Sequence, residues 1–369
     1  MTSSLVGSEM CIRDRTKTPF MAKSDLYKIS GHWDHYKDGM FVLGDEEKDK
    51  EVFALRPMTC PFQYQAYLNR KRSYRDLPLR YNETSTLFRN EASGEMHGLI
   101  RVRQFTISEG HLMCTPEQLE DEFRKCLELA IFMLKTLGLY EDVSYRFSQW
   151  DPNDRAKYIG TEEQWNEAQG LMERILNHLE IPYEIGIGEA AFYGPKLDIQ
   201  IKNVYGKEDT LITIQIDQML AEQFGMVYTD KDGKQKTPCI IHRTSIGCYE
   251  RTLALLIEKY AGAFPLWLAP VQVKLLPIAD RHLDYLYEVK KQLEDKGFRC
   301  EVDDRSEKIG YKIREAQLEK VPYMIVVGDK DIENNTISIR KRKEGDLGAM
   351  TVEQFLEKIV PDRDNKVID

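Results

Sequence analysis

The 369-residue sequence predicts an α+β domain built on an antiparallel sheet, followed by a smaller α/β domain. The chain is too long for one ordinary hydrophobic core, which favours two domains. A proline-bearing segment, Phe264–Pro270, separates two blocks, which we place at about residues 16–264 and 268–369. The first block contains segments that alternate apolar and polar residues, as antiparallel strands with one buried face do. The second alternates strand and helix patterns, which is typical of an α/β domain.

The helices and strands of the first block follow from the spacing of its apolar residues. We expect helices where apolar residues recur every three or four positions, over Pro116–Thr136, Thr161–Leu179 and Gly247–Ala261. Two shorter segments, Leu197–Ile201 and Ile212–Asp217, alternate with period two. A sheet with one apolar face and one polar, ligand-ready face fits both segments.

A third alternating segment, Leu99–His111, carries the residues best suited to chemistry. In a strand, its odd-numbered side chains share one face, and these include Arg101, Arg103, Phe105, Glu109 and His111. We expect a second strand over Thr84–Glu91 and an antiparallel hairpin through the turn-rich loop Ala92–Gly98. Such a hairpin would bring Arg89 close to the other two arginines.

A cluster of guanidinium groups beside an aromatic ring suits a nucleotide. Guanidinium groups bind phosphates through paired, charged hydrogen bonds, and the ring can stack on a base. The sequence contains no GxxxxGK[ST] and no GxGxxG, which excludes a P-loop or Rossmann nucleotide site. An exposed hairpin with solvated charges would give the same pattern.

The second block predicts a mainly parallel sheet covered by helices. Its expected strands are Val271–Ile278, Phe298–Val302, Tyr323–Val327 and Thr336–Arg342, and its expected helices are Arg281–Lys296, Lys308–Lys320 and Val352–Ile359. Gly297 ends the first of these helices well, and Thr351 with Gln354 resembles a capping box that opens the last.

Composition excludes several classes of protein. The 61 acidic and 52 basic residues give a net charge of -9, which argues against nucleic-acid binding by bulk charge but allows a local basic patch. No segment offers the ~20 apolar residues of a membrane span.

Seven cysteines without a CxxC spacing indicate reduced thiols and a cytoplasmic protein. Met1–Arg15 lacks the apolar stretch of a signal peptide and is an uninformative tail.

Two motifs resemble the signatures of class II aminoacyl-tRNA synthetases. Phe88-Arg89-Asn90-Glu91 with Gly98–Phe105 resembles their motif 2, and Gly247-Cys248-Tyr249-Glu250-Arg251 resembles their motif 3. Five further segments resemble threonyl-tRNA synthetases specifically: Ser30–Tyr36, Met58–Pro61, Ser73–Pro78, Phe192–Lys196 and Trp267–Pro270. The resemblance runs from about Thr18 to about Lys358 and implies a catalytic domain of class II type followed by an anticodon-binding domain.

The resemblance implies a site for ATP with Mg²⁺. Arg89 would hold the α-phosphate, and Arg103 and Arg251 would hold the other phosphates. Phe105 would stack on adenine, and Glu91 would bind its amino group. The three arginines would be catalytic, because this chemistry relies on positioning and on charge stabilisation of the transition state.

The resemblance also implies one zinc ion per subunit, held by Cys60, His111 and His242. One thiolate and two imidazoles leave a coordination position open. The amino and hydroxyl groups of L-threonine would bind there and expand the coordination to five. The residues expected to contact threonine are Glu109, Tyr193, Lys196 and Gln215. A site that requires a hydroxyl rejects valine far better than a site that selects by shape alone. Without the resemblance, a lone cysteine or histidine is more often structural.

In the second block, the resemblance implies contacts to the anticodon of tRNA(Thr). The expected residues are Ser306, Lys308, Asp331 and Arg340, and an arginine can pair with a guanine edge. A homodimer is expected. The resemblance leads us to expect that the chain begins inside motif 1, near Pro19, and is truncated at its N-terminus relative to the family. The helix before that proline and the editing domain of most bacterial members are expected to be absent.

Several positions depart from the family pattern. The common Asn-Cys-Pro-Gly-His reads Thr59-Cys60-Pro61-Phe62-Gln63. The single replacements are Ile107 and Thr210 for glutamine, Cys248 for serine, Glu109 for aspartate and Ser306 for asparagine. The predicted zinc ligands and phosphate-binding arginines are retained.

The leading hypothesis is therefore an enzyme that activates threonine with ATP and transfers it to tRNA. The alternative is a catalytically silent synthetase-like protein with a tRNA-binding or regulatory role. The retained Arg89 and Arg251 argue against this alternative. A zinc hydrolase is weaker still, because the sequence has no HExxH. Threonine-dependent exchange of pyrophosphate into ATP separates the first two hypotheses.

Overall fold

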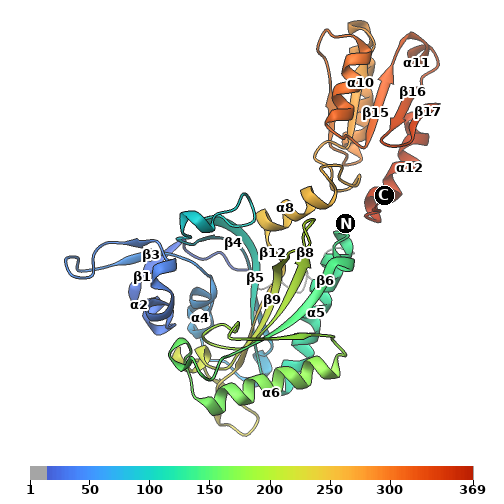
Figure 1. Ribbon diagram of the computed structural model, residues 1–369. Coiled ribbons are helices and arrows are strands. Elements are labelled where there is room, and N and C mark those ends of the chain that lie inside the picture. The colour runs from blue at the N-terminus through green and yellow to red at the C-terminus, as the bar shows by residue number, and fades with distance from the viewer. Residues whose placement is uncertain (1–14, 369) are drawn as a thin grey trace. The chain divides into compact units, whose positions relative to one another are not determined.

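The computed structural model describes residues 15–368 (Figure 1). The chain consists of two compact units, and the division between them along the chain falls between Leu255 and Leu256. The predicted tail, Met1–Arg15, lies outside the described residues except for Arg15.

Unit 1 is built on a seven-stranded sheet with the order β4-β5-β12-β9-β8-β6-β7. Every neighbouring pair is antiparallel except β6 and β7. In chain order the strands are β4 Leu79–Phe88, β5 Gln104–Cys114, β6 Val143–Gln149, β7 Glu184–Ile187, β8 Lys196–Lys202, β9 Glu208–Asp217 and β12 Cys239–Cys248. The predicted α+β domain on an antiparallel sheet is confirmed.

Two long helices, α5 Leu119–Thr136 and α6 Glu162–His178, pack against this sheet at β9, and α5 also packs against β12. The two-residue period of β9 separates its faces. Ile212, Ile214 and Ile216 are almost completely buried, whereas Thr213 and Gln215 line a cavity. The predicted division into one apolar and one ligand-ready face is confirmed.

Smaller elements complete unit 1. A three-stranded sheet has the order β1-β3-β2, and β10 pairs with β11. Their bounds, with those of the short helices, are β1 Met21–Lys23, α2 Ser24–Ile29, α3 His32–Tyr36, β2 Val42–Leu43, β3 Phe53–Leu55, α4 Cys60–Leu68, α7 Leu220–Gln223, β10 Tyr228–Thr229 and β11 Gln235–Lys236. Helix α8, Tyr249–Lys259, follows β12 directly and crosses the boundary between the units.

The β4–β5 hairpin is antiparallel as predicted, but its strands have other limits. Pairing ends at Phe88 and Gln104, so the prediction of strands over Thr84–Glu91 and Leu99–His111 is wrong at the turn. Residues 89–103 form a long connection with a 3-10 turn at Ser93–Glu95. An ion pair of 2.7 Å between Arg101 and Glu91 lies within this connection, and Arg101 and Arg103 precede the strand instead of lying in line with Phe105.

Unit 2 holds a five-stranded sheet with the order β14-β13-β15-β16-β17. Strand β13 is parallel to β14 and β15, whereas β15–β16 and β16–β17 are antiparallel. The expected mainly parallel sheet is therefore a mixed one. The elements are β13 Val273–Pro277, α9 Leu283–Asp295, β14 Cys300–Val302, α10 Ile309–Leu318, β15 Tyr323–Val327, α11 Asp329–Glu333, β16 Ile337–Lys341, β17 Gly345–Met350 and α12 Val352–Asp364.

Strand β17 and helix α11 were not predicted, and α12 extends five residues beyond the predicted end at Ile359. Strand β17 has mostly exposed side chains and two glycines, so it carries no apolar alternation. Helix α11 is one short turn without a buried residue. The predicted capping box of α12 is present, because the backbone N–H of Gln354 donates to the hydroxyl of Thr351.

Candidate active site and metal centre

The polar face of the unit 1 sheet forms a cavity of about 280 Å³. Its walls come from β5, β8, β9 and β12, together with the connection 89–103 and the start of α8. The predicted residues that line it are Cys60, Arg89, Glu91, Phe105, Glu109, His111, Tyr193, Lys196, Gln215, His242 and Arg251. Of the residues predicted for ATP, threonine and metal, only Arg103 is not among its lining residues.

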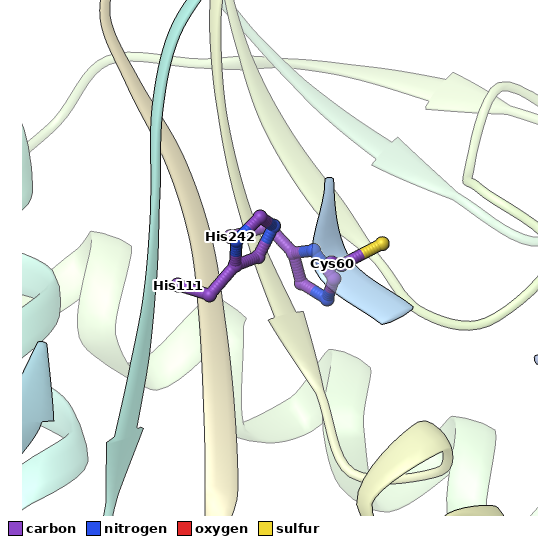
Figure 2. Close-up of side chains that lie close together, drawn as sticks. All are labelled: Cys60, His111 and His242. Atoms are coloured by element: carbon purple, nitrogen blue, oxygen red, sulfur yellow. The ribbon is translucent and has the colours of Figure 1, made fainter. Parts of the chain in front are cut away.

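Cys60, His111 and His242 converge in the wall of this cavity (Figure 2). Their possible ligand atoms lie within 4.8 Å of one another, and all three residues are buried. Cys60 is the first residue of α4, and the two histidines are direct cross-strand partners on β5 and β12. Antiparallel register thus brings together residues that the sequence holds far apart.

The surroundings of the two imidazoles suit metal ligands. Nδ1 of His111 lies 2.6 Å from Oε1 of Gln63, and Nε2 of His242 lies 2.9 Å from a carboxylate oxygen of Asp217. Ligating histidines usually donate their second ring N–H to such an acceptor. Each histidine therefore keeps one ring nitrogen available.

Burial raises the pKa of the Cys60 thiol and lowers that of His111. These shifts disfavour both charged forms, so a thiolate here needs a cation beside it. A thiolate with two neutral imidazoles is a donor set typical of a catalytic zinc site. The residues present therefore fit a zinc ion.

Two arginines are held at the cavity in different ways. Arg251 is fixed by the backbone, because its Nε donates to the carbonyl of Ile100 (3.0 Å) and its Nη1 to that of Thr210 (2.7 Å). The guanidinium of Arg89 lies 5.1 Å from the centroid of the Phe105 ring. Within residues 15–368, the only side-chain hydrogen bond of Arg89 runs from Nε to the carbonyl of Pro57, at 3.4 Å. Its two terminal nitrogens are left for a ligand.

Arg101 lines the cavity, whereas Arg103, the residue predicted for this position, does not. Arg101 also pairs with Glu91. Arg103 is exposed, and its Nε donates to the backbone carbonyl of Glu91. The difference arises because the two residues lie in the connection, where the alternation of a strand does not apply.

The residues predicted for threonine line the same cavity as the metal set. The hydroxyl of Tyr193 donates to Oε1 of Gln215 (2.9 Å), and Nζ of Lys196 lies 2.6 Å from Asp198. Oε1 of Glu109 accepts from the hydroxyl of Ser85 at 2.8 Å. Burial raises the pKa of Glu109 to about 7, so a cation beside this carboxyl would favour its charged form.

Four residues with direct roles in positioning were not singled out from the sequence: Gln63, Ser85, Asp198 and Asp217. The alternation of β8 could have indicated Asp198, which shares the face of Lys196. The alternation of β9 likewise places Asp217 on the face of Gln215, whereas Gln63 and Ser85 depend on contacts between distant segments.

The residues predicted for the anticodon lie in unit 2. Asp331 accepts from the backbone N–H of Gly328 and from the hydroxyl of Ser338. Ser338 is two residues from Arg340 on β16, so the two share a face. Ser306 and Lys308 lie in the loop between β14 and α10, and the structure records no bond that joins them to Asp331 or Arg340 among the residues it describes.

Residues 41–260 match the family described as the tRNA synthetase class II core domain (G, H, P, S and T), which is more than half of the chain. The chain belongs to this class II tRNA synthetase family. Residues 272–361 of this class II synthetase match the anticodon binding domain family.

Two similar curated relatives of this class II synthetase carry the same name. Over 345 residues it is 66% identical to the threonine–tRNA ligase of Clostridium perfringens and 67% identical to that of Clostridium botulinum. Each match covers 94% of this chain and 54% of the relative, so the chain spans about half the length of these curated relatives. It also resembles the crystal structure of the RNA binding domain of threonyl-tRNA synthetase from Cryptosporidium parvum, with a TM-score of 0.86 and 32% identity over 97% of this chain and 90% of that one.

No helix between residues 15 and 368 is both long enough and apolar enough to cross a membrane.

Proposed function

We propose that this chain acts as a threonine–tRNA ligase. ATP and L-threonine would give threonyl-adenylate and pyrophosphate, and the threonyl group would then pass to tRNA(Thr) with release of AMP. One observation carries the proposal: a buried set of one thiol and two imidazoles opens into the same cavity as Arg89 and Arg251. A cation site for an amino acid and an anion site for a nucleotide would thus lie side by side.

The arginines would bind the phosphates of ATP, which is expected to carry Mg²⁺. The free terminal nitrogens of Arg89 suit the α-phosphate, where charge develops during attack by the threonine carboxylate. Arg251 is already held by two carbonyl groups, so it would lose little conformational entropy on binding. Arg101 is better placed than Arg103 for the remaining contact, because it lines the cavity.

Adenine would stack on Phe105, whose ring lies under the Arg89 guanidinium. Glu91 would accept a hydrogen bond from the adenine amino group. Its carboxylate is paired with Arg101, so binding would require the two side chains to share or exchange partners.

Threonine would be selected next to the metal set. Zinc held by Cys60, His111 and His242 would bind the amino and hydroxyl groups of threonine. Gln215 is oriented by Tyr193 and would contact the bound amino acid. The charged form of Glu109 would accept a hydrogen bond from the amino group of threonine. Valine has no hydroxyl, so binding it would leave this polar site unsatisfied.

The other parts of the proposal concern the whole protein. We assign residues 16–264 to catalysis and residues 268–369 to the anticodon, through Ser306, Lys308, Asp331 and Arg340. A homodimer and a cytoplasmic location remain predictions.

The test is pyrophosphate exchange into ATP, measured with threonine, serine and valine in parallel on zinc-loaded protein. We expect exchange with threonine and with serine, which also carries a hydroxyl, and rejection of valine by roughly 10⁴-fold or more. No exchange with any of the three would refute the proposal and favour the silent alternative.

The metal assignment has its own test. Cys60→Ala should lose stoichiometric zinc, because it removes the only thiolate of the set. The matched control is Cys114→Ala, which removes an equally buried thiol on β5 that is not part of the set. Metal analysis of both purified variants decides the question, and zinc retained by Cys60→Ala would contradict the ligand assignment.

A further inference from the structure

The two histidines of the metal set are oriented by different means. His242 contacts the carboxylate of Asp217 directly, at 2.9 Å. His111 instead contacts the side-chain amide of Gln63, at 2.6 Å. An amide offers an oxygen that accepts or a nitrogen that donates, so by itself it does not decide which ring nitrogen of His111 carries the proton.

Further contacts of Gln63 settle its orientation. Its amide nitrogen lies 2.8 Å from the hydroxyl oxygen of Thr16. That hydroxyl lies 3.2 Å from the carboxylate of Glu83 and 3.5 Å from the backbone carbonyl of Asn82. Both of these groups only accept hydrogen bonds, and two oxygens 3.2 Å apart with no proton between them repel, so the single hydroxyl proton of Thr16 is directed at the carboxylate of Glu83. The hydroxyl oxygen is then left to accept from the amide of Gln63.

The side chain of Glu83 is surrounded by hydrogen-bond donors. Its oxygens receive hydrogen bonds from Arg56 at 2.9 Å and from the backbone N–H and the hydroxyl of Thr18. The side chains of Arg56 and Glu83 are 1% and 3% exposed. Both oxygens of Glu83 accept from these donors, so Glu83 acts as an acceptor toward the hydroxyl of Thr16 as well.

We propose that Glu83, Thr16 and Gln63 form a relay that sets the tautomer of His111. The carboxylate of Glu83 orients the hydroxyl of Thr16, the hydroxyl orients the amide of Gln63, and the amide oxygen accepts the proton on Nδ1 of His111. Nε2 is then the ring nitrogen of His111 that keeps a lone pair for a metal. The three are positioning residues for the ligand, and the inference rests on the proposed zinc site.

Substitutions at Thr16 separate this relay from ordinary packing. Thr16→Ser keeps the hydroxyl and loses the methyl group, whereas Thr16→Val keeps the shape and loses the hydroxyl. The measurement is the zinc dissociation constant, obtained by competition with a chromophoric chelator. We expect Thr16→Ser to stay within about threefold of the wild type and Thr16→Val to bind roughly 10- to 100-fold more weakly, as other losses of groups behind a ligand do. The reverse order would show that shape matters and would overturn the relay.

Gln63→Leu should weaken zinc binding at least as much as Thr16→Val. The matched control is Gln118→Leu, because Gln118 also bonds through both ends of its amide, to Leu77 and Thr115. Zinc affinity should be unchanged in this control. An equal loss in both glutamine variants would mean that the effect is general destabilisation, which would also overturn the relay.

A measurement on the unaltered chain makes the test independent of variants that fail to fold. Long-range ¹H–¹⁵N correlation spectra of the zinc-loaded, histidine-labelled protein should show a proton on Nδ1 of His111 and none on Nε2. A proton on Nε2 would overturn the relay while leaving the zinc site intact. If the wild type binds no zinc, the proposed site fails, and the relay falls with it.

Discussion

Gly247 is the position where one methyl group should do most harm to the candidate site. It lies at φ +72°, in the irregular stretch where the register of β12 and β5 shifts between Thr244 and Cys248. A Cβ built on it would lie 1.9 Å from the carbonyl oxygen of Leu211 on β9. Ordinary contacts of a Cβ begin at 3.4 Å, so the two backbones would have to separate by about 1.5 Å.

The expected cost of Gly247→Ala has two parts. A left-handed backbone costs an alanine roughly 1–2 kcal/mol, and forcing a methyl group into packed structure costs a further 1–3 kcal/mol or so. The free energy of unfolding should therefore fall by about 2–5 kcal/mol. The matched control is Gly233→Ala, because Gly233 has φ +80° but nothing within 4 Å of its added Cβ. The free energy of unfolding of this control should fall only by the cost of the left-handed backbone, about 1–2 kcal/mol.

The assay is urea unfolding followed by tryptophan fluorescence. Trp33, Trp150 and Trp165 lie in unit 1, so three of the four tryptophans of the chain report on the affected unit. Equal losses of unfolding free energy in the two variants would refute the steric reasoning.

The same substitution should also impair catalysis. The carbonyl of Thr210, next to Leu211, accepts the 2.7 Å bond that holds Arg251. A displacement of about 1 Å in a group that positions a substrate can cost roughly 100-fold in rate. We therefore expect pyrophosphate exchange by Gly247→Ala to fall by about that factor below the melting transition, and exchange by Gly233→Ala to be unchanged.

Three other substitutions give separate expectations. Arg89→Ala should lower the rate of pyrophosphate exchange roughly 10²–10³-fold with zinc content unchanged, because it removes charge stabilisation of the transition state. Asp329→Asn should lower the thermal unfolding midpoint of unit 2 at neutral pH, because bonds from Arg281 and then His282 hold the pKa of this carboxyl well below its usual value. A depressed carboxyl pKa stabilises the fold above about pH 4 and loses its effect as the pH falls through the folded-state value, so the gap to the wild type should close in acid. Arg340→Ala should weaken charging of tRNA(Thr) while exchange stays intact, because the residue lies in unit 2.

Each of these expectations has an outcome that contradicts it. Zinc lost from Arg89→Ala would point to a damaged fold. A gap between Asp329→Asn and the wild type that widens in acid would show that the ion pair is not its cause. Equal losses of exchange and charging in Arg340→Ala would place its effect in catalysis and count against anticodon contact.

Much of unit 1 could be predicted because its strands carry a local signal. Alternation in β5 and β9 identified which side chains share the ligand-ready face, and Phe105, Glu109, His111 and Gln215 all line the cavity. The same rule failed at Arg101 and Arg103, since alternation was extended into a connection beyond the end of the β4–β5 pairing.

The sequence by itself determined the faces of the strands, the limits of the long helices and, through its motifs, the family and the candidate ligands. Tertiary structure alone decided that His111 stands opposite His242, that α4 delivers Cys60 to both, and that Gln63 and Asp217 support the two imidazoles. The physical reason is one of range. Periodicity is set by the geometry of neighbouring residues, whereas register and the partners of buried polar groups are set by contacts between segments that the chain keeps far apart.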